Sequence, residues 1–145
     1  MKILQVIPYF AWEYGGPVKF VHDLSKELAE LGHEVTICTT DVGVKNHLEK
    51  RNKLKIDGVN VIYFKCFSNT LGNNLKLHFS RQMRVFFKNN LDKFDIVHLH
   101  EFRSVSNIYL QHYAKKYETP YIIQPHGSLP LIIGNQTQGS TFSKR

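Results

Sequence analysis

The first forty residues, MKILQVIPYFAWEYGGPVKFVHDLSKELAELGHEVTICTT, decide the fold of this 145-residue chain. An apolar segment from Ile3 to Pro8 predicts a buried strand, and a segment from His33 to Thr40 predicts a second one. Between them, apolar residues recur at steps of three and four and predict a helix that Pro17 opens. These apolar residues are Val18, Val21, Leu24, Leu28 and Leu31. Strand, helix and strand in this order are typical of a parallel βαβ unit.

The same alternation continues through the rest of the chain. Strands are expected at Val59–Lys65, Asp95–His100 and Tyr121–Gln124, and helices at about Leu77–Leu91 and Val105–Tyr117. With right-handed crossovers, the five strands predict a Rossmann-like three-layer α/β sandwich. Its sheet is expected to be mostly parallel and doubly wound, with strand order 3-2-1-4-5.

Length and composition indicate one domain. Hydrophobic residues make up 42% of the chain and charged residues 21%, which is typical of a globular protein. We expect residues 1–127 to form the domain, and residues 128–145 to be a loop or a poorly ordered tail. Cys38 and Cys66 lie in or beside predicted strands and are expected to be reduced, buried thiols of a cytosolic protein. Neither an export signal nor a membrane-spanning segment is predicted.

The net charge of +7 favours anionic partners and comes largely from two segments. The polar stretch from Asp41 to Asp57, with its lysines from Lys45 to Lys55, is expected to be a solvated loop. Arg81, Arg84 and Lys88 instead share one face of a predicted helix beside several phenylalanines. This pattern indicates either an interfacial helix that contacts a membrane or another anion, or a helix whose phenylalanines pack on the sheet. No nucleic-acid recognition motif accompanies the charge.

Polar and glycine-rich segments follow strands 1, 4 and 5 of the predicted sheet. In an open parallel sheet, ligands bind beyond the carboxyl ends of the strands, near the point where the strand order reverses. The predicted order reverses between strands 1 and 4, which lead to Gly15-Gly16 and to His100-Glu101. Strand 5 leads to His126-Gly127. The sequence therefore predicts a ligand site where these segments meet.

The segment Gly15-Gly16-Pro17 permits close approach of a ligand to the first turn of a helix, where an anion is favoured. The same pair of glycines is equally explained by a turn that leads into the helix. Neither GxGxxG nor a Walker lysine motif is present, which disfavours an ordinary nicotinamide dehydrogenase or P-loop enzyme. His98 is interpreted as a structural histidine, and no metal site is predicted, because the histidine spacing lacks further paired ligands.

Several segments, taken in order, resemble family 4, or "group 1", retaining glycosyltransferases of the GT-B fold. The resemblance covers about residues 1–130 and rests on MKILQVIP at residues 1–8, GGP at 15–17, LAELGHEV at 28–35, DIVHLH at 95–100, and the segment from Pro120 to Gly127. It implies a hexosyltransferase-type enzyme that transfers a sugar from a nucleotide-sugar donor to an acceptor hydroxyl, with retention and without a metal. The nucleotide-sugar is a substrate, so no cofactor is expected.

The resemblance also implies roles for single residues. His126 would lie by the donor sugar as the catalytic residue, and Gly15, Gly16 and Gly127 would line the donor site. His100 and Glu101 would contact the acceptor, which is a sugar or a lipid-linked acceptor. In lipid-directed members a basic surface meets the membrane, which makes Arg81, Arg84 and Lys88 candidates for a peripheral contact at the inner face of the cytoplasmic membrane.

One feature of the family is missing from this sequence. Members carry a second, carboxyl-terminal domain with two glutamates separated by seven residues, and no glutamate pair here has that spacing. We therefore expect an acceptor-side domain that is inactive without a donor domain, or one subunit of a split glycosyltransferase. The alternative is a non-catalytic Rossmann-like module that binds a membrane or a protein partner.

Overall fold

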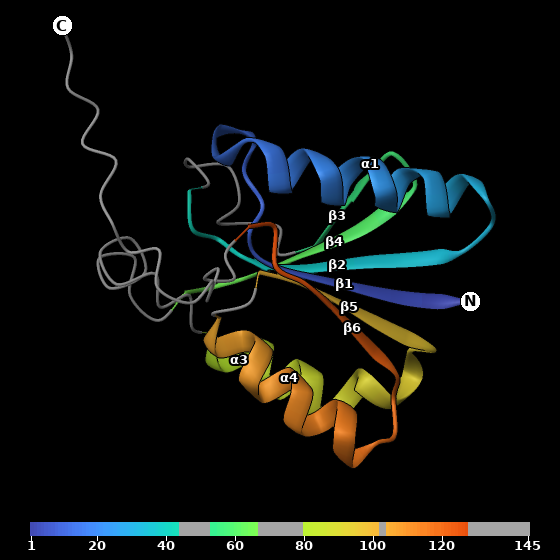
Figure 1. Cartoon of the computed structure of the whole chain (residues 1–145), viewed down its shortest axis with the longest axis vertical. Helices are drawn as coiled ribbons and strands as arrows, with labels where there is room; N and C mark the ends of the chain where they lie inside the picture. Colours follow the sequence, from blue (N-terminus) through green and yellow to red (C-terminus); the bar gives the residue numbers. More distant parts are fainter. Residues whose placement is uncertain (44–52, 67–79, 102–103, 128–145) are drawn as a thin grey trace, which may run out of the picture.

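The computed structural model describes residues 1–43, 53–66, 80–101 and 104–127, which form a single sheet with helices on both faces (Figure 1). The strands are β1 (Lys2–Tyr9), β2 (Glu34–Thr40), β3 (Lys53–Ile56), β4 (Val59–Phe64), β5 (Ile96–His100) and β6 (Tyr121–Gln124). The helices are α1 (Gly16–Glu30), α3 (Arg81–Asn90) and α4 (Val105–Lys116), with short 3-10 turns η1 (Trp12–Tyr14) and η2 (Leu91–Lys93). The predicted tail at 128–145 and residues 77–79 of the predicted second helix lie outside the described residues.

The sheet confirms the predicted α/β class and adds one strand to it. Its order is β3-β4-β2-β1-β5-β6, and all neighbours are parallel except β3 and β4. The five parallel strands thus follow the predicted order 3-2-1-4-5. The expectation of a solvated loop as far as Asp57 was wrong for Lys53–Ile56, which forms an antiparallel hairpin with β4. Asp57 and Gly58 both adopt positive φ in the connecting turn, and Asp-Gly is a strong signal for such a turn.

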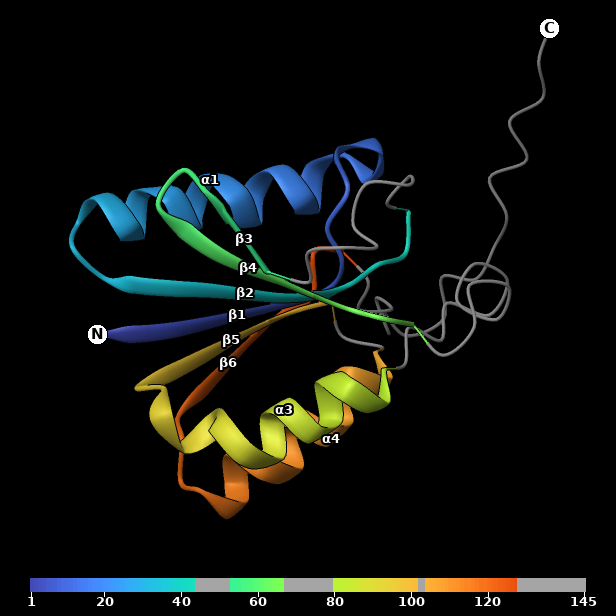
Figure 2. The same ribbon diagram turned by 180° about the vertical axis from the view of Figure 1, so that it is seen from behind.

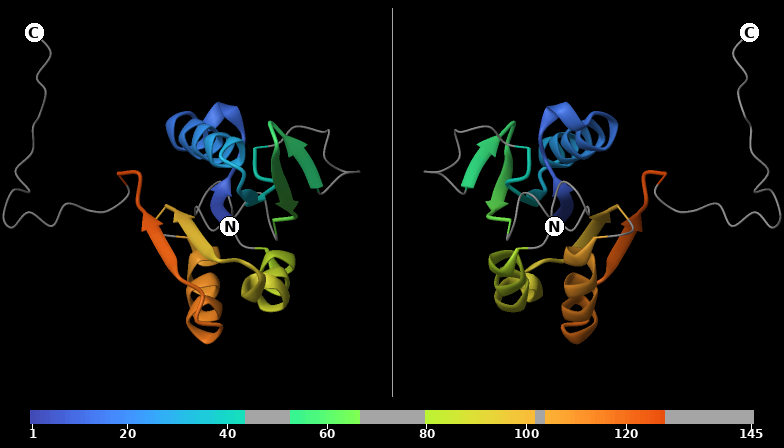
Figure 3. Two further views of the ribbon diagram at one scale, coloured as in Figure 1. Left: turned by 90° about the vertical axis from the view of Figure 1, so that its right-hand side faces the viewer. Right: turned by 90° about the vertical axis from the view of Figure 1, so that its left-hand side faces the viewer.

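The helices cover the two faces of the sheet unequally. Helix α1 lies on one face, and α3 and α4 lie side by side on the other (Figures 1 and 2). The end-on views in Figure 3 show the same three layers, with the β3–β4 hairpin at one edge and β6 at the other. Along β1, Ile3 and Ile7 pack under α1, while Leu4 and Val6 pack toward α3 and α4. This alternation is the period of two that a strand between two layers requires.

The phenylalanines of α3 pack on the sheet, which was one of the two alternatives left open by the sequence. Phe87 is fully buried, and Phe86 packs against the same core cluster, so this stripe belongs to the sheet contact. Burial of a phenylalanine of this kind stabilises the fold by about 1.5–3 kcal/mol. Ser80 caps the helix by accepting a hydrogen bond from the Met83 amide at 3.4 Å. The helix therefore begins at Arg81, later than the expected start at Leu77.

Two smaller expectations can also be compared with the structure. Cys38 and Cys66 are both buried, and neither forms a disulfide bond, as the sequence predicts. Leu31 was expected on the buried stripe of the first helix but is exposed, because α1 ends at Glu30 and Leu31 is its cap residue. None of the helices in the described part of the chain has the length and apolar character needed to cross a membrane.

A buried polar pair joins two strands at the centre of the sheet. The His100 Nε2 atom lies 2.7 Å from Gln5 Oε1, and neither side chain is exposed to solvent. Burial lowers the pKa of His100 to about 2, with the neighbouring imidazoles of His98 and His126 adding to the effect. Burial also lowers the pKa of His98, against a smaller opposing effect of its hydrogen bond with Gln124. Both imidazoles of β5 are therefore neutral in the folded protein.

The neutral His100 makes the stability of this domain depend on pH. Its folded pKa lies below the unfolded value of about 6.5, so in the window between them the unfolded chain binds a proton that the folded chain does not. The contribution of His100 to stability is fully present above this window and is lost as the pH falls through it. Between about pH 7.5 and about pH 5.5, we expect the unfolding free energy of the wild type to fall by about 1 kcal/mol more than that of His100→Gln.

This prediction is checked by urea unfolding at the two pH values. His112→Gln, the same substitution at an exposed histidine, is the matched control and should keep the wild-type pH dependence. Equal pH dependence in wild type and His100→Gln would contradict the prediction, whatever the absolute stability of the variant.

Candidate functional site

The carboxyl edge of the sheet, where β1, β5 and β6 end, collects most of the predicted site residues. Helix α1 begins at this edge, and Phe20, four residues from Gly16, lies edge-on to His126 with 5.3 Å between ring centroids. The same ring lies 6.2 Å from His100. The structure thus brings the glycine-rich start of α1 next to the two histidines that follow strands β5 and β6. Arg81, Arg84 and Lys88 are on α3, in the opposite layer.

His126 is held in a conformation that few residues adopt. Its φ is +48°, in the left-handed region, and Gly127 continues there at +82°. A positive φ costs free energy for any residue with a side chain, so the surrounding contacts must hold it in place. One of these contacts joins His126 Nε2 to His100 Nδ1 at 2.9 Å, with the two rings stacked at 5.1 Å. His126 is half-buried and lies at the surface of the site.

His100 lies beneath His126 and is fully buried. Both of its ring nitrogens are occupied, one by Gln5 and the other by His126. In this geometry both nitrogens already have protein partners, and acceptor contact by His100 stays a prediction. The His100 ring contacts Gln5 of the neighbouring strand β1 and lies near Phe20 of α1, on the face of the sheet that α1 covers.

Glu101 marks the exit from β5. Its φ is +70°, and its amide donates to the carbonyl of Gln124 at 2.9 Å. Asn107 of α4 donates from Nδ2 to the carbonyl oxygen of Glu101 at 2.5 Å. These two bonds tie the exit of β5 to the end of β6 and to the start of α4. Acceptor contact by Glu101 stays a prediction.

Tyr9 lies next to Glu101 at the point where the sheet order reverses. Burial raises the pKa of Tyr9, and the negative charge of Glu101 raises it further. The ring of Tyr9 packs on that of Tyr14, with 4.5 Å between centroids. A Cβ atom at Gly43 would collide with the Tyr14 ring, so the glycine permits this close approach. Two phenol groups therefore pack together at the carboxyl end of β1, with the Glu101 carboxylate near Tyr9.

The two glycines before α1 have different explanations. Gly15 has φ +74° and donates its amide to the carbonyl of Trp12 at 3.2 Å, so the turn requires a glycine there. Gly16 has no positive φ, and a Cβ built on it would meet no atom within 4 Å. No contact in the described part of the chain explains Gly16. A ligand at the start of α1, where helix amides lack carbonyl partners, would explain it.

Gln5 and Phe20 belong to this site but were not identified from the sequence. Gln5 carried a weak signal, because it is a polar residue between Ile3 and Ile7 in an otherwise apolar strand. Phe20 carried none, since an aromatic residue off the apolar stripe of a helix is an ordinary surface residue.

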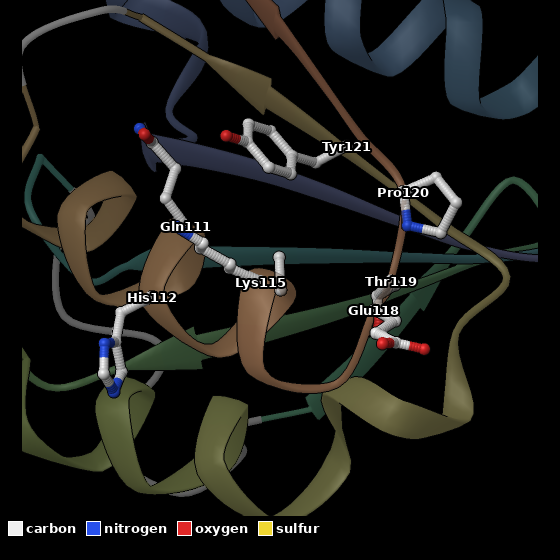
Figure 4. Close-up of a pocket in the computed structure, with 8 residues that line it drawn as sticks. Gln111, His112, Lys115, Glu118, Thr119, Pro120 and Tyr121 are labelled. Carbon is white, nitrogen blue, oxygen red and sulfur yellow. The ribbon is translucent and has the colours of Figure 1, made fainter.

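A separate cavity of about 590 Å³ lies between α4 and the beginning of β6 (Figure 4). It is lined by Gln111, His112, Ala114, Lys115, Glu118, Thr119, Pro120 and Tyr121. Because Pro120 and Tyr121 stand at the amino end of β6, this cavity is at the opposite end of the strand from His126. Among the residues that the structure describes, no group of three or more histidine, cysteine, aspartate or glutamate side chains could hold a metal ion.

Comparisons with known proteins agree with the fold and identify a family. The family model described as Glycosyltransferase Family 4 matches residues 14–144, a range that includes Gly15, His100 and His126. No curated protein sequence matches the chain. A solved structure, the C-terminal domain of a hydrogenase from Pyrococcus furiosus, aligns with a TM-score of 0.51 and 22% identity over 85% of this chain and 90% of that one. At this identity the likeness concerns the fold alone. With the family model matching nearly its whole length, the chain belongs to glycosyltransferase family 4.

Proposed function

We propose that this chain is the acceptor-side domain of a GT-B glycosyltransferase. The reaction moves a hexosyl group from a nucleotide-sugar donor to an acceptor hydroxyl, with retention and without a metal. Family membership supports the reaction class. The observation that carries the proposal is the strained His126, stacked on His100 beside the start of α1 at the carboxyl edge.

The site offers different chemistry to the two substrates. The first turn of α1 favours the negative charge that develops on a departing phosphate group. The surface beside His126 would then hold the donor sugar, with Gly127 giving close access to it. The Tyr9 hydroxyl can donate to or accept from a sugar hydroxyl group, and the Glu101 carboxylate can accept from one, which suits an acceptor with several hydroxyl groups. In this proposal the acceptor is a sugar or a lipid-linked sugar.

In this proposal the described groups at the carboxyl edge form one side of the donor site. A nucleotide-sugar would need contacts to its base and ribose, which the family resemblance assigns to a second Rossmann-like domain. We therefore propose that turnover requires that domain, on the same chain or on another. Glycan biosynthesis in the cytoplasm is the setting that fits such donors.

The basic face of α3 favours an additional membrane contact. Arg81, Arg84 and Lys88 line a cavity of about 230 Å³ together with Val85 and Tyr113. The Arg84 guanidinium stacks over the Tyr109 ring at 4.8 Å, which holds it at the surface. No carboxylate in the described ranges forms an ion pair with these three cations. We propose that this face binds the headgroups of an anionic lipid surface at the inner face of the membrane.

The first prediction concerns His126 in the two-domain enzyme. His126→Ala should lower turnover on the order of 100-fold, the effect of removing one preorganised polar group from such a site, while circular dichroism shows an intact fold. His112→Ala, at an exposed histidine near the other cavity, should leave turnover unchanged. Wild-type turnover in a folded His126→Ala enzyme would remove His126 from the site.

The second prediction concerns the chain alone. Without a donor domain we expect no sugar transfer above background, measured as nucleotide released from a panel of nucleotide-sugars with simple sugar acceptors. Addition of the donor domain should restore it. Transfer by the isolated chain at an ordinary enzyme rate would sink the half-enzyme proposal.

The third prediction concerns α3. Joint charge reversal to glutamate at Arg81, Arg84 and Lys88 should abolish co-sedimentation with vesicles rich in anionic lipid, since each cation near the surface contributes about 1 kcal/mol. Joint reversal at Lys19, Lys26 and Lys115, which changes the net charge equally, is the control and should leave most of the binding intact. Equal binding by both triple variants would exclude α3 as the membrane contact.

A further inference from the structure

We propose that Gln5 and His100 are positioning residues that fix the tautomer of His126, so that His126 presents the lone pair of its Nδ1 atom to a hydroxyl group of the sugar substrate. The substrate part of this inference rests on the proposed function. The tautomer part stands on the geometry of three side chains and can be tested without any substrate.

The first step is the bond between Gln5 and His100. The two atoms are 2.7 Å apart, and Gln5 Oε1, a carbonyl oxygen, can only accept a hydrogen bond. His100 Nε2 must therefore carry a proton and donate it. Gln5 and His100 are both buried, so water does not compete for either atom. The amide of Gln5 thus selects one of the two neutral forms of His100.

The second step is the bond between the two histidines. Burial and the neighbouring imidazoles lower the pKa of His100, so its ring holds a single proton, the one on Nε2. Its Nδ1 atom is then a lone pair and can only accept. Because His126 Nε2 lies 2.9 Å from that lone pair, His126 must donate from Nε2. Gln5 fixes the tautomer of His100, and His100 in turn fixes the tautomer of His126 at the surface of the site.

The third step is the second ring nitrogen of His126. In the neutral tautomer with its proton on Nε2, the ring carries a lone pair on Nδ1, and no hydrogen bond joins that atom to another of the described residues. The edge-on contact with Phe20 and the stack on His100 limit rotation of the ring. A fixed lone pair accepts a hydrogen bond from a hydroxyl group and repels a phosphate oxygen. The geometry therefore assigns a sugar hydroxyl to His126 and leaves the phosphate to the start of α1.

The tautomers can be measured directly by NMR on the isotope-labelled chain. Long-range proton–nitrogen correlation separates protonated from unprotonated ring nitrogens, because their nitrogen chemical shifts differ widely. At neutral pH we expect the Nε2–H form for both His100 and His126. If His100 in the wild-type chain carried its proton on Nδ1, it would donate to His126 instead of accepting from it, and the proposal would be overturned.

Variants at Gln5 test whether the preference starts there. Gln5→Leu removes the acceptor and should give His126 a mixture of tautomers, seen as intermediate nitrogen shifts. Gln5→Glu keeps an oxygen acceptor and should restore the Nε2–H form at both rings, a rescue that a purely structural role for Gln5 does not predict. Gln111→Leu, the same substitution on α4, should leave both rings unchanged. Unaltered His126 nitrogen shifts in a folded Gln5→Leu chain would refute the role of Gln5 in fixing the tautomer. If Gln5→Leu does not fold, the tautomers of the wild type and of Gln5→Glu test the same role.

A kinetic measurement on the two-domain enzyme tests the hydroxyl contact. Gln5→Leu should lower kcat/KM about tenfold, the effect of one hydrogen bond, and Gln5→Glu should recover most of it. Among deoxy analogues of the sugar, the one that lacks the contacted hydroxyl should have a kcat/KM about tenfold below that of the full sugar with the wild-type enzyme. With Gln5→Leu, the kcat/KM for this analogue should equal that for the full sugar. Equal losses in both enzymes for every analogue would overturn the hydroxyl contact. If the tautomers were fixed as expected but the two-domain enzyme transferred no sugar, the proposed function would be refuted, and the tautomer part of the inference would still hold.

Discussion

Strand β1 pairs in parallel with β2 on one side and with β5 on the other, and the sheet order reverses at this point. Parallel strands all end at one edge, so segments far apart in the sequence meet there. The end of β1 lies beside Glu101, and the loop after β6 brings His126 over His100. Helix α1 starts at the same edge and returns over the sheet. The histidine stack joins β5 to the loop after β6, and its contact with Phe20 reaches α1, the helix that follows β1.

Polar groups inside the sheet extend the site below its surface. An amide in the middle of β1 is costly to bury unless it finds a partner, and His100 supplies one. The same burial keeps His100 neutral, so the pair acts as a fixed link and not as a titrating one. A strained residue such as His126 persists only where its surroundings hold it, and this link is part of what holds it.

The described surface separates distinct chemistries. As proposed, the start of α1 would bind an anion, and the groups beside it, Tyr9, Glu101 and His126, would bind hydroxyl groups. The cations of α3 lie in the opposite layer, over a cavity of their own. In the proposed enzyme, a membrane contact through α3 would therefore not compete with the carboxyl edge for the same residues. Such a separation is compatible with an enzyme that meets a lipid-linked acceptor at a membrane while a second domain brings the donor.

The sequence by itself determined the βαβ alternation, the five parallel strands and the edge at which the glycines and histidines gather. These follow from local periodicity and from glycine and proline at segment ends, which a single sequence records. Only the tertiary structure decided that Lys53–Ile56 is a strand, since alternating lysines also fit a solvated loop. It alone decided that His100 points inward to Gln5, 95 residues away. Strand periodicity gives the face of a side chain, but its partner depends on the register and tilt of a neighbouring strand, which packing of the whole domain sets.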